Sequence, residues 1–190
     1  MDNNIECGRI KILFCRKPEK RIDVICRKVV KQLDGDQAPT IIFTTSNDAK
    51  DWTKQLLCTA GATPEAIDEN LLKRISEMPL YISANKSFDI GYLSWRILDA
   101  VKNQKVKKVY VESSESLTVS CPNENDYNIG GAVGTVLRHL ADSLGIEIIL
   151  FSSSAIPGEE DQALEFPEVF IEPNGLSKYA DEFIYIDNQI

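Results

Sequence analysis

The stretch VLRHLADSLGIEIILFS, residues 136–152, carries the two patterns that decide the fold. Together with Val133, its first half repeats apolar residues at three- and four-residue steps, which predicts a helix with one buried face. Gly145 ends that helix, and residues 146–151 form a short apolar run that predicts a buried strand. A helix that leads directly into a buried strand is typical of α/β domains.

The same alternation of helices and strands continues along the rest of the chain. The sequence predicts further strands at residues 10–14, 40–44, 80–82, 109–111 and 183–186. It predicts further helices over about residues 22–33, 48–57, 64–77 and 90–101, and a polar loop over residues 113–131. Because helices separate the strands, we expect a mostly parallel, twisted sheet with helices on both faces. The 190 residues suffice for a single domain, residues 1–190, with its core over about residues 9–187.

Composition and charge narrow the classes of function. The net charge is −8, which disfavours binding to DNA or anionic membranes, because both require basic residues. No apolar run is long enough to cross a bilayer, and the chain does not start with a basic and apolar leader, so we expect a cytoplasmic location. The five cysteines include no C-x-x-C pair, and we expect them to be reduced structural residues rather than metal ligands.

Two more segments, together with residues 136–152, carry a resemblance to a known family. They read PLYIS over residues 79–83 and YADEFIYI over residues 179–186. In this order and spacing, the chain resembles the C-terminal motor domain of DnaB-type replicative helicases from about Arg9 to Ile186. The resemblance implies a RecA-like P-loop NTPase core. It also implies the family's activity, an ATP- and magnesium-dependent motor that unwinds duplex DNA at replication forks.

The phosphate loop of that family is not retained. A working loop reads G-x-x-x-x-G-K-[ST], because glycines let consecutive backbone N–H groups converge on a phosphate. Here the corner after the first predicted strand, residues 14–22, reads FCRKPEKRI and contains no glycine. Under the resemblance, Arg21 replaces the phosphate-binding lysine and Ile22 replaces the hydroxyl residue that holds magnesium. We therefore expect no bound cofactor, neither ATP nor magnesium.

The other catalytic positions implied by the resemblance have also changed. Ser46 replaces the glutamate that activates water, and Ser153 replaces a polar glutamine sensor. Glu165-Phe166-Pro167 replaces the basic motif that acts on the neighbouring subunit's nucleotide, so that an anion stands where a cation would stabilise transition-state charge. Glu112 is the one acidic residue that remains, at the position of a metal-linked aspartate. The domain is thus expected to be degenerate.

Two features remain as candidate sites. Arg16, Lys17, Lys20 and Arg21 cluster at the start of the first predicted helix, where backbone N–H groups and the helix dipole favour an anion. The favoured alternative is a solvated basic face, because exposed cations there cost little. Glu112 is either a remnant metal carboxylate or, as we favour, a hydrated or helix-capping acid at the end of a strand.

Contacts with DNA and with further subunits are not expected. No Lys or Arg lies between Ser113 and Arg138 or between Phe151 and Glu172, the stretches aligned with DNA-contacting loops. Their acidic residues would repel a phosphate backbone. The N-terminal domain and linker helix that fasten helicase subunits into a ring are not found in the sequence, so we expect a monomer or small homo-oligomer rather than a hexamer. The aromatic residues Trp52, Tyr92 and Trp95 are expected to pack in the core or at an interface.

Three functions follow from these observations. The first is a non-catalytic interaction or regulatory module that binds an as yet unknown protein partner and is linked to DNA replication. The second is an ATP-dependent helicase or ATPase of unusual sequence. The third is a sensor for an anion or small ligand at the former phosphate site.

Overall fold

Six strands form one sheet in the order β3-β2-β5-β7-β1-β8, and every pairing in it is parallel. The computed structural model describes residues 8–15, 17–35, 38–45, 49–62, 69–120, 129–153 and 175–186. The strands are β1 (Arg9–Phe14), β2 (Thr40–Thr44), β3 (Leu80–Ala84), β5 (Lys108–Val111), β7 (Glu147–Ser152) and β8 (Glu182–Tyr185). Two short strands, β4 (Phe88–Asp89) and β6 (Leu117–Thr118), pair with each other beside it.

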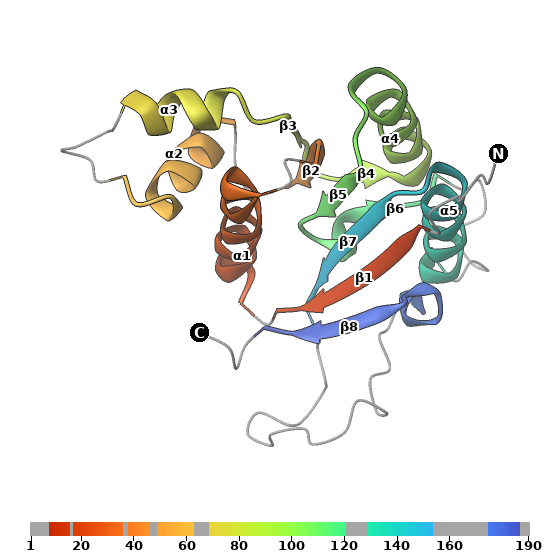
Figure 1. The fold of residues 1–190 in the computed structure, drawn as a ribbon. Helices are drawn as coiled ribbons and strands as arrows, with labels where there is room; N and C mark the ends of the chain where they lie inside the picture. Colours follow the sequence, from red (N-terminus) through yellow and green to blue (C-terminus); the bar gives the residue numbers. More distant parts are fainter. Residues whose placement is uncertain are drawn as a thin grey trace.

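Helices cover both faces of the sheet, as Figure 1 shows. One layer contains α1 (Pro18–Val30), which continues into the 3₁₀ helix η1 (Lys31–Asp34), and α2 (Ala49–Thr59), against which α3 (Glu69–Ser76) packs. The opposite layer contains α4 (Ile90–Gln104) and α5 (Ile129–Leu144). Two further 3₁₀ turns are η2 (Ser114–Ser116) and η4 (Leu176–Tyr179). Among the helices described, none is long and apolar enough to cross a membrane.

The alternation of side chains along the strands creates two cores. In β1, Ile10, Ile12 and Phe14 belong to the core beneath α4 and α5, whereas Leu13 belongs to the core beneath α1 and α2. Successive side chains of a strand point to opposite faces, so a strand buried on both faces must be apolar throughout its length. This explains why the predicted strands were continuous apolar runs. The predicted parallel sheet with helices on both faces is confirmed.

One hydrogen-bonded clamp joins α5 to the edge of the sheet. Arg138 of α5 donates to the Asp181 carboxylate at 2.7 Å and to the Gly8 carbonyl at 2.5 Å, and it also pairs with Asp142. Asp181 in turn accepts from the Ile10 backbone N–H at 2.7 Å. These bonds fix the positions of α5, β1 and the start of β8 relative to one another.

Several expectations require correction. The predicted loop over residues 113–131 is wrong at both ends, because η2 and β6 occupy residues 114–118 and α5 begins at Ile129. A two-residue strand is too short to produce a period in the sequence, so β4 and β6 left no signal. Trp52 is fully buried as expected, but Tyr92 and Trp95 are 43% and 58% exposed and do not belong to the core. Cys15 and Cys26 are buried and Cys58 is exposed.

Candidate functional site

The carboxyl ends of the parallel strands meet at one edge of the sheet. Phe14, Thr44, Val111 and Ser152 end the neighbouring strands β1, β2, β5 and β7 there. Helix α1 begins above the same edge, directly after β1. In open parallel sheets, ligands bind outside these carboxyl ends, so this edge is where a site is sought.

The corner between β1 and α1 contains only three residues, Cys15 to Lys17. Pro18 stands in the first turn of α1, a position where its missing N–H costs nothing. The Lys20 N–H donates to the Lys17 carbonyl at 3.0 Å, so the backbone already turns as a helix. Of the residues aligned with the phosphate loop, Pro18 to Ile22 are therefore wound into α1. Among the described residues of this corner, the backbone from Pro18 onward is helical rather than a loop.

The predicted basic cluster does not form one surface. Arg21 is 4% exposed, and its Nη1 donates to the Glu112 carbonyl at 3.2 Å and to the Glu115 carboxylate at 3.3 Å. The expected solvated face is therefore wrong for Arg21. Lys17 is exposed and Lys20 is half-buried, while Arg16 lies outside the described residues.

Glu112 is buried at the end of β5 and is 2% exposed, so the favoured expectation of a hydrated acid is wrong. Its carboxylate accepts from the Thr44 hydroxyl and from the Thr45 backbone N–H, the latter at 3.1 Å. The Trp52 indole N–H donates to the same Thr44 hydroxyl at 3.2 Å. This chain of bonds ties β5 to β2 and α2.

Glu115 is the residue that sequence reasoning missed. Its Oε1 accepts from the hydroxyls of Ser152 and Ser153, at 3.3 and 2.7 Å, and from the Ser153 backbone N–H. Its Oε2 accepts from the Ser113 hydroxyl at 2.6 Å and from Arg21 at 3.3 Å. We call these five residues the Glu115 cluster. The one signal in the sequence was the presence of serines after two neighbouring strands.

The hydrogen bonds of the Glu115 cluster favour a charged carboxylate. Burial raises the pKa of Glu115, but hydrogen bonds from Ser113 and Ser153 outweigh burial and hold the pKa below its ordinary value. Glu115 therefore remains an anion at neutral pH, and the positive charge of Arg21 is matched within the chain itself.

ATP and magnesium, which the fold implies, do not fit these residues. The corner offers no glycine-rich cradle, Arg21 already contacts Glu115, and the Glu112 carboxylate is hydrogen-bonded to Thr44. Nowhere in the described ranges do three or more His, Cys, Asp or Glu side chains gather as metal ligands. Ser46, residues 165–167 and the acidic residues at 124, 126 and 159–168 lie outside the described residues.

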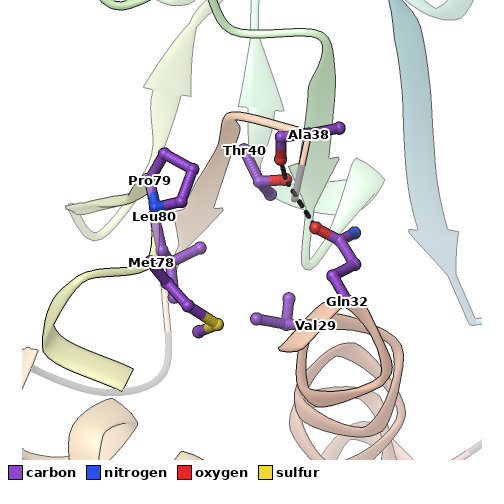
Figure 2. Close-up of a pocket in the computed structure, with 7 residues that line it drawn as sticks. All are labelled: Val29, Gln32, Ala38, Thr40, Met78, Pro79 and Leu80. Carbon is purple, nitrogen blue, oxygen red and sulfur yellow. Dashed lines mark hydrogen bonds between the residues drawn. The ribbon is translucent and has the colours of Figure 1, made fainter. Parts of the chain in front are cut away.

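A small pocket lies at the opposite edge of the sheet, where β2 and β3 begin (Figure 2). Its lining comes from Val29, Gln32, Ala38, Thr40, Met78, Pro79 and Leu80. The Thr40 hydroxyl donates to the Ala38 carbonyl at 2.8 Å and lies 3.5 Å from the Gln32 side-chain oxygen. The enclosed space has room for about one water molecule. This pocket is too small for an organic ligand and is distant from the carboxyl edge.

Comparisons with known proteins show the fold of the chain. No protein-family profile matches it, and neither does any curated protein sequence. Among solved structures, one described as an ATPase domain is similar with a TM-score of 0.78 and 16% identity over 95% of this chain and 69% of that one. A DnaB-like replicative helicase, described with its interactions with primase, is similar with a TM-score of 0.71 and 15% identity over 95% of this chain and 47% of that one. The chain therefore has the RecA-like fold of the ATPase domains of DnaB-like helicases, as its sequence predicts.

Proposed function

We propose that this domain is a degenerate DnaB-like domain that hydrolyses no ATP and acts as an interaction module for a protein partner. It requires no cofactor, does not bind nucleic acid by itself, and works in the cytoplasm as a monomer or small homo-oligomer. A link to DNA replication is supported by the similar structure described as a replicative helicase with its interactions with primase.

The observation that carries the proposal is the three-residue corner between β1 and α1. A triphosphate is normally held by several backbone N–H groups of a glycine-rich loop. Here Pro18 has no N–H, and the Lys20 N–H donates within the first turn of α1. Arg21, a cation of the former loop, donates to the Glu112 carbonyl and to the Glu115 carboxylate instead.

Calorimetric titration with ATP and magnesium tests the loss of catalysis. We expect no saturable heat up to millimolar nucleotide, and no hydrolysis with or without single-stranded DNA. The ATPase domain of a replicative helicase, titrated in the same buffer, serves as the positive control. The alternative function, an unusual ATPase or helicase, predicts one-to-one binding and magnesium-dependent hydrolysis, and either result would reject our proposal.

The outer face of α4 supports the role in binding a protein. Trp95, Leu98 and Tyr92 are 58%, 47% and 43% exposed, and the rings of Tyr92 and Trp95 lie 6.2 Å apart. The Arg96 guanidinium lies 5.8 Å from the centre of the Trp95 ring. Exposed aromatic residues beside an arginine are typical of the centre of protein interfaces. We call this surface the α4 face; Figure 1 shows α4 at the outside of its layer.

The charges around the α4 face indicate the kind of partner. From Ile90 to Lys105 the chain carries the basic residues Arg96, Lys102 and Lys105 but only one acidic residue, Asp99. This local excess of positive charge in a chain of net charge −8 favours an acidic protein surface as the partner. The acidic residues elsewhere in the chain would repel an acidic partner, so such a partner is expected to bind at the α4 face.

Substitution of Trp95 tests the α4 face. We expect Trp95→Ala to reduce retention of an acidic partner from a cell lysate at least tenfold. Truncation of an aromatic residue at the centre of an interface typically weakens the binding free energy by about 2 kcal/mol or more. Leu72→Ala is the matched control, since Leu72 is an exposed apolar residue on α3 that is 39% exposed. Retention of the same protein by wild type and Leu72→Ala, with loss at high salt, supports the proposal. If Trp95→Ala retained the partner as well as wild type does, the α4 face would not be the binding surface.

A further inference from the structure

Five hydrogen-bond donors from three separate elements converge on one carboxylate in the Glu115 cluster. Arg21 comes from α1, Ser113 from the turn after β5, and Ser152 and Ser153 from the end of β7. They supply a guanidinium, a backbone N–H and three hydroxyls, and both carboxylate oxygens are engaged. A surface glutamate in a simple ion pair makes one or two such bonds, so this arrangement resembles a site built for an anion.

The cluster also holds hydrogen-bonding capacity that Glu115 does not use. Arg21 Nε and Ser114 Oγ are buried, and neither has a hydrogen-bond partner. Buried polar atoms are normally satisfied, and an unsatisfied one calls for an explanation. Arg21 belongs to the Glu115 cluster, so its Nε is unused hydrogen-bonding capacity within that cluster, whereas Ser114 is only the chain neighbour of Glu115.

Glu115 is reachable from solvent, although its charged partner Arg21 is not. Its side chain is 37% exposed, whereas that of Arg21 is 4% exposed. The residue lies in η2, a turn of three residues at the surface edge of the sheet. An external anion therefore reaches Arg21 only where the Glu115 carboxylate now lies, and it must take the place of that carboxylate.

We propose that the Glu115 cluster is an oxyanion site whose ligand is the chain's own Glu115, and that this carboxylate closes the site to external anions. The inference rests on the proposed function, because an open site for a triphosphate would contradict both. It goes further by naming the group that closes the site and the ligand class that fits it. That class is a singly charged oxyanion, above all a carboxylate.

The group that now fills the site indicates this class. The donors engage both oxygens of one carboxylate, and Arg21 places one positive charge opposite the single negative charge of Glu115. A singly charged carboxylate restores this pair, whereas a doubly charged phosphate would add a negative charge that Arg21 does not match.

The experiment is chemical rescue of the variant Glu115→Ala, since the group removed has the size and charge of acetate. We expect the variant to unfold at a lower temperature than wild type, and acetate to recover about half of that loss. Ligand binding raises the melting temperature by mass action, so above the dissociation constant the recovery must rise with the logarithm of acetate concentration. Sodium chloride at equal ionic strength, and phosphate at equal concentration, should recover far less.

Controls separate binding from general salt effects. Glu77→Ala removes an exposed glutamate that lies 4.0 Å from Lys73, and acetate should leave its melting temperature unchanged, as in wild type. Adding Arg21→Met to Glu115→Ala should abolish the rescue; if that double variant fails to fold, Ser153→Ala in its place should weaken the rescue several-fold.

The outcomes are distinct for the two proposals. Absence of rescue in a folded Glu115→Ala protein, or equal stabilisation of all variants by acetate, would overturn this inference and leave the proposed function intact. Binding of ATP and magnesium by the wild type would instead reject the proposed function, and the closed site with it. Rescue that follows the logarithm of acetate concentration and requires Arg21 supports the closed oxyanion site.

Discussion

Gly8 lies directly against the backbone of α5, with no room for a side chain. A Cβ atom built at this position would lie 1.9 Å from the Ala141 carbonyl oxygen, which belongs to the helix backbone and cannot rotate away. The Gly8 carbonyl also accepts a hydrogen bond from Arg138. The close approach of β1 to α5 therefore depends on a residue without a side chain.

We predict that Gly8→Ala lowers the free energy of unfolding by about 1–3 kcal/mol, the usual cost of forcing a methyl group into a packed contact. Chemical denaturation measures the change. Gly35→Ala is the control, because the nearest atom to a Cβ there, the Lys31 carbonyl oxygen, is 4.0 Å away and the φ of Gly35 is −138°. Equal stability of the two variants would show that the contact at Gly8 is easily relieved.

Individual residues also show where sequence reasoning reaches its limit. The sequence identified Arg21 and Glu112 as candidates, because the resemblance aligns both with functional positions of the helicase family and Arg21 also belongs to a basic cluster at a predicted helix start. It did not identify Glu115 as the partner of Arg21, since the two residues are separated by 94 positions and pair only through the order of the strands. The sequence also failed to predict burial, because Arg21 and Glu112 were expected to be charged residues at the surface, yet both are almost fully buried.

At the scale of elements, the Arg138 clamp joins α5, β1 and β8 through Asp181. The hydrogen bond that Asp181 accepts from the Ile10 N–H lowers the pKa of Asp181 below its ordinary value of 3.8. Burial raises this pKa, and the hydrogen bond and positive charge of Arg138 lower it further. A carboxylate with a lowered pKa in the folded state stabilises the fold above its unfolded pKa. That contribution is lost as the pH falls through the folded pKa.

We therefore predict that the free energy of unfolding of the wild type falls below about pH 4. The variant Asp181→Asn is expected to be less stable than wild type at pH 7, but its free energy of unfolding should change less between pH 4 and pH 2. The Asp181 carboxylate is about half exposed, so solvent screening limits its contribution to the free energy of unfolding to well under about 1 kcal/mol. Urea denaturation at a series of pH values measures both slopes. Parallel pH profiles for the two proteins would show that the clamp does not depend on the charge of Asp181.

Elements with a long apolar period were predictable from the sequence. All six strands of the sheet were placed within two residues at each end, because each contains an apolar run, which is longest in the central strands that are buried on both faces. The start of α1 was harder to place: its apolar stripe begins at Ile22, whereas the helix begins at Pro18. The four residues from Pro18 to Arg21 are charged or proline, and only proline gives a signal for a helix start.

For the molecule as a whole, the order of helices and strands predicted a parallel α/β sheet, the family resemblance implied the RecA-like fold, and two solved structures with 16% and 15% identity share that fold. The α4 face could not be predicted in the same way. Trp95 and Tyr92 stand at helical spacing in an apolar helix, and a sequence does not reveal which side of such a helix is left uncovered. That depends on which neighbours the sheet brings to it.

The short corner between β1 and α1 affects how this protein can transmit a signal. Motors change shape at loops that rearrange when a ligand arrives or departs, because such segments absorb large changes of backbone angle. The connection here has three residues and is followed by a proline with a fixed φ angle, so it is too short and too restricted to act as such a hinge. The start of α1 is thus expected to keep its place against β1 whether or not a ligand is present at this edge of the sheet.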